Sequence, residues 1–132
     1  MSAGAPARAP RVLVLEDDPD LLELIALLLE SEQFEVRVGR DGSEGLACIA
    51  RLGLPDVVLL DLKMPVMDGG EFARRFRARY GEAAPIVVIT AADDARKRAA
   101  EVHAAAWLAK PFDLDALVRV LRGQLAAHPP AG

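Results

Sequence analysis

The chain carries acidic and basic residues at the ends of short apolar segments, where they could handle a phosphoryl group and a divalent cation. Glu16 and Asp17 follow the first such segment, and Asp61 follows the third. Lys110 stands directly after the last one. If these segments are parallel strands, their carboxyl ends meet at one edge of a sheet, which is where open α/β sheets place their chemistry.

Each of these residues also has an ordinary structural explanation. Asp18 precedes a proline and is interpreted as a helix N-cap, but capping does not explain the two acids before it. Taken alone, Asp61 could be a turn residue and Lys110 a surface lysine. Taken together, carboxylates on neighbouring strand ends repel one another unless a proton or cation relieves them. The combination therefore predicts Mg²⁺, which prefers hard oxygen ligands.

Two further strand-end residues fit the same chemistry. Asp61 is a candidate nucleophile, because a carboxylate can form an acyl phosphate. Thr90 ends the fourth apolar segment, and its hydroxyl could donate to a phosphoryl oxygen. Threonine is also common at strand ends for reasons of β propensity alone, so both interpretations of Thr90 stay open. Pro111 biases Lys110 toward an extended conformation.

Apolar segments rich in β-branched residues alternate with amphipathic segments along the chain. Strands are predicted at residues 11–15, 34–38, 56–60, 85–89 and 106–108. Helices are predicted after Asp18, Asp41, Asp68 and Asp113, with a polar helix over Asp94–Val102. This alternation predicts an α/β fold: a doubly wound, five-stranded parallel sheet of order 2-1-3-4-5 with five helices on two faces, the flavodoxin-like arrangement.

Composition narrows the class of protein. A chain of 132 residues is long enough for one domain with a core. The net charge of −4 argues against nucleic-acid binding, and we expect no membrane segment. Cys48 is the single cysteine, which suits a reducing, cytoplasmic location. We predict a disordered leader at 1–10, one domain at 11–126 and a flexible tail at 127–132.

Four strings, VLVLEDD, DVVLLDLKMPVMDG, PIVVITA and WLAKPF, occur in this order. Together they resemble the receiver domain of bacterial two-component response regulators, of the chemotaxis-regulator type. The resemblance covers roughly Arg11 to Leu125, which is nearly the whole chain. It implies a phosphorylation-switched signalling module, a phosphoprotein that catalyses only its own phosphoryl transfer and dephosphorylation and is otherwise no enzyme.

The resemblance also implies a role for each site residue. Asp61 would accept a phosphoryl group from a histidine kinase or a phosphotransfer protein. Asp17 and Asp61 would bind Mg²⁺ directly, Glu16 through water, and Lys63 through its backbone carbonyl. Lys63 and Ala92, which flank the site, are expected to tune the lifetime of the phosphorylated form.

The same resemblance assigns the switch and the output surface. Thr90 would move onto the phosphoryl group, and Lys110 would pair with a phosphoryl oxygen. Trp107, three residues before the lysine, stands where the family carries its switch aromatic. The face of helix four, strand five and helix five would contact a downstream protein target or a second copy of the chain. Such a receiver acts either as a stand-alone protein or as the N-terminal part of a longer regulator.

Three features depart from the family pattern. Trp107 is bulkier than the usual tyrosine or phenylalanine, and a plain packing residue on strand five is the alternative. His103 replaces a glycine at a position that often needs positive φ. The fourth helix is predicted to be short. Two other functions stay open: an adaptor of the same fold that works without phosphorylation, and a metal-dependent phosphohydrolase, which would turn over phosphoesters continuously.

Overall fold

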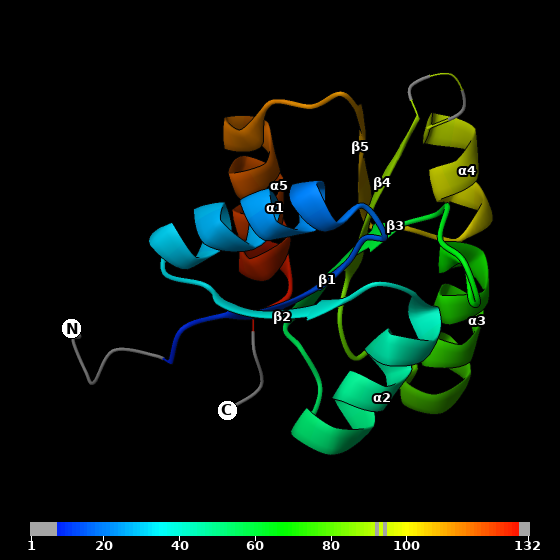
Figure 1. Cartoon of the computed structure of the whole chain (residues 1–132). Coiled ribbons are helices and arrows are strands. Elements are labelled where there is room, and N and C mark those ends of the chain that lie inside the picture. Colours follow the sequence, from blue (N-terminus) through cyan, green and yellow to red (C-terminus); the bar gives the residue numbers. More distant parts are fainter. Residues whose placement is uncertain (1–7, 92, 94, 130–132) are drawn as a thin grey trace.

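The computed structural model describes residues 8–91, 93 and 95–129, and within them five strands form one parallel sheet (Figure 1). The strand order is β2-β1-β3-β4-β5, which confirms the predicted flavodoxin-like fold. The strands are β1 (Arg11–Leu15), β2 (Glu35–Gly39), β3 (Val57–Asp61), β4 (Ile86–Ala91) and β5 (Ala106–Lys110). β3, β4 and β5 each run one or two residues further than predicted, so that Asp61, Thr90 and Lys110 belong to strands.

The described helices begin where the sequence places their N-caps. They are α1 (Pro19–Ser31), α2 (Gly42–Leu52), α3 (Gly69–Tyr80), α4 (Ala95–Glu101) and α5 (Leu114–Ala127). Four aspartates accept hydrogen bonds from backbone N–H groups of the first turns, which stabilises each helix by about 1 kcal/mol: Asp18, Asp41, Asp68 and Asp113. α4 has only seven residues, so the predicted short helix is confirmed, although Asp94 lies outside the described residues.

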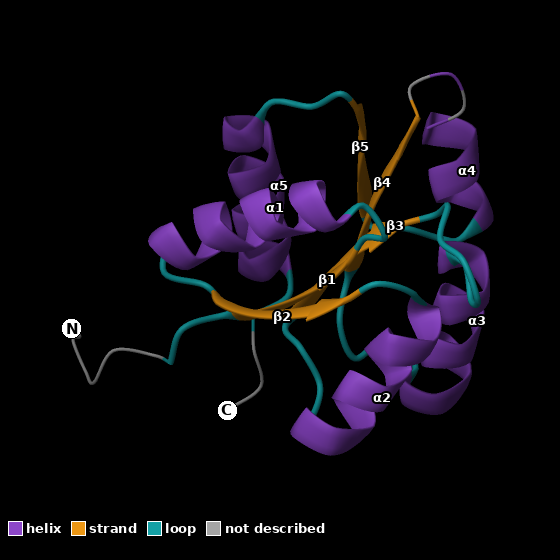
Figure 2. Cartoon of the chain, in the orientation of Figure 1, coloured by secondary structure: helices purple, strands orange, loops and turns teal. Residues whose placement is uncertain are grey.

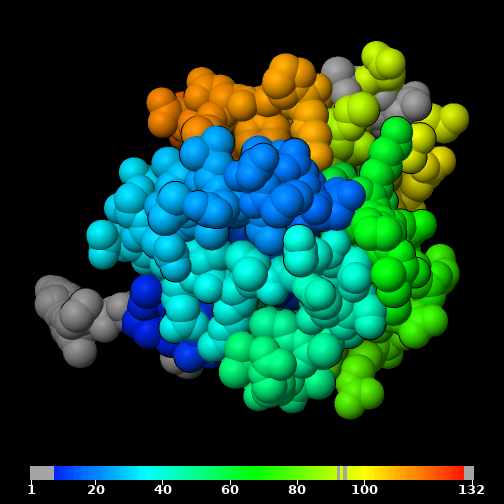
Figure 3. All heavy atoms as spheres, in the orientation of Figure 1, coloured from blue at the N-terminus to red at the C-terminus, as the bar shows by residue number. Residues whose placement is uncertain are grey.

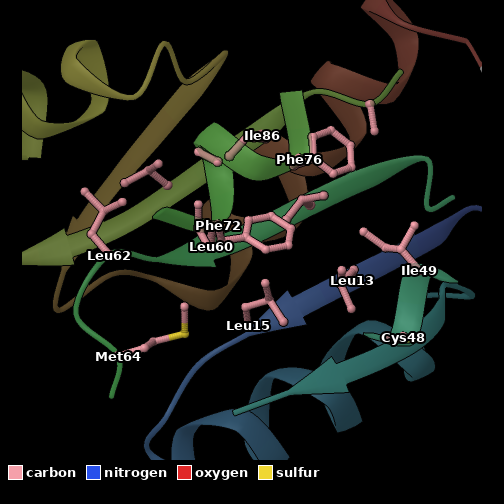
Figure 4. Packing of buried hydrophobic residues seen from close by; sticks show 14 residues of the cluster. Leu13, Leu15, Cys48, Ile49, Leu60, Leu62, Met64, Phe72, Phe76 and Ile86 are labelled. Carbon is pink, nitrogen blue, oxygen red and sulfur yellow. The ribbon is translucent and has the colours of Figure 1, made fainter. Parts of the chain in front are cut away.

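The helices cover the sheet on two faces (Figure 2). α1 and α5 bury Ile25 and Leu117 against one face, together with Val14 and Leu59 of the central strands. On the other face, α2 and α3 pack against β1 and β3, where Phe72 and Phe76 point toward the sheet (Figure 4). β3 is buried along its whole length, as expected of a strand covered on both sides.

The register of the sheet brings the polar residues to one edge. Leu15 pairs with Leu60, so Glu16 and Asp61 each follow a paired position on β1 and β3. On the other side, Asp61 pairs with Ile89, and Lys110 of β5 pairs with Ala91 of β4. Parallel pairing alone thus places the carboxylates, the threonine and the lysine at adjacent strand ends.

Three described residues other than glycine have positive φ, and one of them is Gln33, after α1, with a φ of 73°. His103 has a φ of 53°, so the positive φ expected at this departure from the family pattern is confirmed. Val66, in the loop after β3, has a φ of 65° and is 88% exposed. A β-branched residue adopts this conformation only when its surroundings impose it, and no pattern around Val66 predicts it.

The first described residues lie at the opposite end of the strands from the polar cluster. Pro10, within the segment predicted as a leader, accepts a hydrogen bond from the Glu35 N–H at 2.9 Å. The Arg8 guanidinium donates to both carboxylate oxygens of Asp56, at 2.7 and 2.9 Å. Residues 1–7 and 130–132, the rest of the predicted leader and tail, lie outside the described part. None of the described helices has the length and apolarity to cross a membrane.

Gly69 permits the close approach of α3 to the end of β3. A Cβ at this position would lie 2.6 Å from the Asp61 carbonyl oxygen and 2.8 Å from the Leu62 Cα, both backbone atoms. We expect Gly69→Ala to lower the free energy of unfolding by about 1–3 kcal/mol in urea titrations, because the backbone must move. Gly70→Ala is the matched control, since its Cβ would meet nothing nearer than an Asp68 side-chain oxygen at 3.4 Å. Equal losses for both variants would contradict this explanation.

Candidate phosphoacceptor and metal site

Three carboxylates gather at the carboxyl ends of β1 and β3. Glu16, Asp17 and Asp61 each place one oxygen within 4.8 Å of the others. Glu16 and Asp61 are buried, whereas Asp17 is exposed. The structure therefore brings together the three acids that the sequence predicted as metal ligands, with two of them largely out of water.

The Lys110 ammonium joins the two buried carboxylates. Its Nζ lies 2.9 Å from Glu16 Oε1 and 3.2 Å from Asp61 Oδ2. Partial burial alone would lower the pKa of Lys110, but the hydrogen bond to Glu16 and the charge of Asp61 outweigh it and raise that pKa. The lysine stays charged and offsets part of the repulsion between the acids.

Burial raises the pKa of Glu16 to about 7. The backbone N–H of Asp18, which donates to Glu16 Oε2 at 3.0 Å, and the Lys110 ammonium both oppose this rise, and the charge of Asp61 adds to it. Glu16 is therefore poised to hold or release a proton near neutral pH. A cation at the cluster would favour the ionised carboxylate.

The loop after β3 fixes Asp61. The Lys63 N–H donates to Asp61 Oδ1 at 3.1 Å, so both carboxylate oxygens have a partner. The loop is closed by a hydrogen bond from the Gly69 N–H to the Leu62 carbonyl at 3.1 Å. The carboxylate is held in one orientation, as an attacking group must be.

Thr90 stands beside this group on β4 with its side chain unsatisfied. The residue is 1% exposed, and its hydroxyl has no hydrogen-bond partner among the described residues. A buried hydroxyl without a partner costs about 1–3 kcal/mol, so such a group calls for a functional explanation. It is available to donate to an acceptor placed at the site.

The remaining predicted residues lie around the site or away from it. Lys63 is exposed next to Asp61, whereas Ala92 lies outside the described residues. Trp107 of β5 is 43% exposed, on the surface rather than in the site. His103, at the end of α4, takes no part in the cluster.

The donor set fits a small divalent cation. Three carboxylates face one ammonium, which leaves negative charge uncompensated when Glu16 is ionised. Mg²⁺ takes oxygen ligands, usually one or two carboxylates with several waters, and the exposed Asp17 leaves one side of the cluster open to solvent.

The acidic cluster thus lies at the topological switch point of a flavodoxin-like sheet, where proteins of this fold class bind their ligands. Residues 12–122 match the family of response regulator receiver domains, so the chain belongs to that family. Its acidic cluster is typical of the magnesium site of receivers, and receiver domains interact with histidine kinases.

Individual relatives agree with this assignment. The chain is 38% identical over 117 residues to the transcriptional regulatory protein TrcR of Mycobacterium tuberculosis, covering 87% of this chain and 45% of TrcR. A putative response regulator from Chloroflexus aurantiacus superposes with a TM-score of 0.81 at 32% identity, over 89% of this chain and 98% of that one. The chemotaxis protein CheY4 of Vibrio cholerae gives 0.81 at 30% identity, over 89% and 99%. The chain spans about half the length of the curated relatives it matches.

Sequence reasoning missed the supports of the site. Gly69 lets α3 pack closely against the end of β3. The sequence marks this glycine only as the residue after Asp68, at the predicted start of a helix. The Met67 carbonyl accepts a hydrogen bond from the Gly42 N–H at 2.8 Å and so ties the same loop to α2. No spacing in the sequence indicates such a contact.

The raised pKa of Glu16 makes stability depend on pH. Between about 4.5 and about 7 the folded chain holds a proton that the unfolded chain has released. The contribution of this group to the free energy of unfolding therefore falls as pH rises through that window and levels off above it. In metal-free buffer, we expect the free energy of unfolding, measured by urea titration, to fall less between pH 5.5 and pH 8 for Glu16→Gln than for the unmodified protein.

Glu23→Gln, on the exposed side of α1, is the control for that comparison. It should keep the full pH dependence. A Glu16→Gln variant whose stability changes with pH as steeply as the unmodified protein would exclude a raised pKa for Glu16.

Proposed function

We propose that this receiver accepts a phosphoryl group on Asp61 from the phosphohistidine of a histidine kinase or phosphotransfer protein. The observation that carries the proposal is the environment of Asp61: a buried carboxylate held by the Lys63 N–H and Lys110 beside two further acids. An ordinary turn aspartate has no reason to be buried next to a second buried carboxylate.

The phosphoryl transfer needs no reactants other than the donor phosphohistidine and the Asp61 carboxylate. One Asp61 oxygen attacks phosphorus, and an O–P bond forms as the N–P bond to the donor imidazole breaks. The electron pair of that bond returns to the imidazole nitrogen, and the product is an acyl phosphate. Lys110, already bound to both buried acids, can then follow the new negative charge.

The metal site supports the same reaction. Asp17, Asp61 and the Lys63 carbonyl would hold Mg²⁺, with Glu16 contributing through water. When bound, the cation supplies neutralisation of the charge on the transferring phosphoryl oxygens. Without it, Lys110 alone faces three carboxylates, so we expect transfer to depend on the metal.

Thr90 and Trp107 are proposed to turn the new charge into a signal. A phosphoryl oxygen would give the unpartnered Thr90 hydroxyl its acceptor and draw the end of β4 toward the site. The face of α4, β5 and α5, which carries the exposed Trp107, would then change its population of conformations and contact a downstream protein. The switching unit is residues 11–126, and Lys63, exposed at the site, would influence access of the hydrolytic water.

Incubation with acetyl phosphate and Mg²⁺ should add one phosphoryl group to the intact protein, measured by mass spectrometry under conditions that preserve acyl phosphates. Asp61→Asn and a chelated sample should show no adduct. Asp20→Asn, at an exposed position of α1, should be modified like the unmodified protein. An adduct that persists in Asp61→Asn would refute the assignment of the acceptor.

Acrylamide quenching of Trp107 tests the switch. The chain has one tryptophan, so its fluorescence reports a single site. We expect phosphorylation to reduce the quenching constant about twofold as the indole moves inward, because its exposed area would fall. In Thr90→Ala the protein should still be phosphorylated, but quenching should stay unchanged.

The alternative is an adaptor that binds its partner without phosphorylation. The exposed, bulky Trp107 favours it, because a large indole turns inward less readily than a smaller ring. Unchanged quenching in the phosphorylated protein, together with equal partner affinity of Asp61→Asn, would establish this alternative.

A further inference from the structure

Positive charge is concentrated on α3 and α4. These two helices carry seven of the chain's 16 lysines and arginines but only two acids, Glu71 and Glu101, in a protein of net charge −4. The basic residues are Arg74, Arg75, Arg77, Arg79, Arg96, Lys97 and Arg98. In Figure 3 these helices, green and yellow, form the right-hand edge of the molecule, away from α1. The rest of the protein is correspondingly acidic.

A groove of about 510 Å³ runs between α3 and the end of α4. Arg74 and Arg77 line it from α3, and Glu101 and His103 line it from α4 and the turn that follows. Val102, which is partly buried, supplies apolar surface between these polar residues, whereas Ala73 at the floor of the groove is only 1% exposed. The groove thus combines cationic walls with an apolar stretch, and it is separate from the acidic cluster at the strand ends.

Hydrogen bonds give this groove a defined shape. The Arg77 guanidinium donates to the Val102 carbonyl at 2.5 Å and to the His103 carbonyl at 2.7 Å, which joins α3 to the turn after α4. Arg74 and Arg75 both pair with one carboxylate, Glu71, so the acid cannot neutralise both. The Arg74 side chain remains 71% exposed, with guanidinium N–H groups available to a ligand.

We propose that this groove docks an acidic, amphipathic segment of a partner protein. Carboxylates of the segment would bind the guanidinium of Arg74 and the outer edge of Arg77, and an aliphatic side chain would cover Val102. A polyphosphate is the poorer match, because it has no apolar group to cover Val102 and carries more negative charge past Glu101 on the rim. The surface includes α3, which lies outside the face proposed for output.

The test uses a synthetic 14-residue peptide with leucines at helical spacing and glutamates elsewhere, titrated into isotopically labelled protein near 0.15 M salt. Amide shifts should be largest in α3 and around Val102 and His103. Arg74→Ser should weaken binding about tenfold, the loss expected for one charged hydrogen-bonded pair. Glu101→Gln should strengthen binding, because it removes a like charge from the rim.

Arg75→Ser is the matched control. Arg75 lies on the same helix and shares Glu71, but it lines a different groove, against α2. It should change affinity less than about twofold, because its side chain faces the other groove and would not contact the peptide directly, and exposed ion pairs contribute little. Equal losses of peptide affinity in Arg74→Ser and Arg75→Ser would mean that the peptide is held by nonspecific charge attraction and not by the groove, and would overturn the proposal.

Three other outcomes would also overturn it. The first is equal affinity for a peptide with glutamine in place of glutamate. The second is tighter binding of a single-stranded oligonucleotide, which would make the surface one for nucleic acid. The third is the absence of saturable shifts at about 1 mM peptide, a concentration that detects even weak recognition.

Discussion

Repulsion between the two buried carboxylates is the constraint around which this molecule is arranged. Glu16 and Asp61 end neighbouring strands, and two negative charges at that separation, removed from water, are tolerated only with compensation. The positive charge of Lys110 provides part of this compensation. The raised pKa of Glu16 provides another part, because a fraction of the Glu16 carboxyl groups stays protonated near neutral pH. The negative charge that remains uncompensated favours the binding of a cation at this cluster.

Lys110 can compensate the two carboxylates only because the sheet places it next to them. β5 contributes Lys110 from 49 residues beyond Asp61, and only the parallel order β1-β3-β4-β5 places their carboxyl ends side by side. The buried strands and the two helical layers hold that order. The buried hydroxyl of Thr90, which has no hydrogen-bond partner among the described residues, lies on β4, the strand between Asp61 of β3 and Lys110 of β5.

Much of this arrangement could be predicted from sequence, because the signals are local. Asp18, Asp41, Asp68 and Asp113 mark helix starts by their side-chain chemistry, and the period of apolar residues distinguishes strand from helix. The strand order then follows from the rules for connecting parallel strands through helices. The position of Glu16, Asp17 and Asp61 directly at the ends of predicted strands identifies them as site residues. The conformation at His103 could be anticipated because a histidine replaces a residue that would adopt positive φ freely.

The rest depends on contacts between distant residues. Nothing near Arg77 in the sequence indicates that it binds carbonyls 25 and 26 positions away. The exposed position of Trp107 likewise depends on how helices cover an edge strand, which a resemblance to a family does not determine.

Arg8 and His128 line one hollow with Asp56, at the edge of the sheet opposite the acids. The described part of the chain therefore begins and ends on the same side of the molecule, and the bidentate pair with Asp56 anchors Arg8 there. A fluorescent protein or an affinity tag joined near Arg8 or His128 would lie on the side of the molecule opposite the acidic cluster, and would leave Asp61 accessible. The same geometry makes the two ends convenient to connect, so that a circular permutant opened elsewhere would need only a short linker.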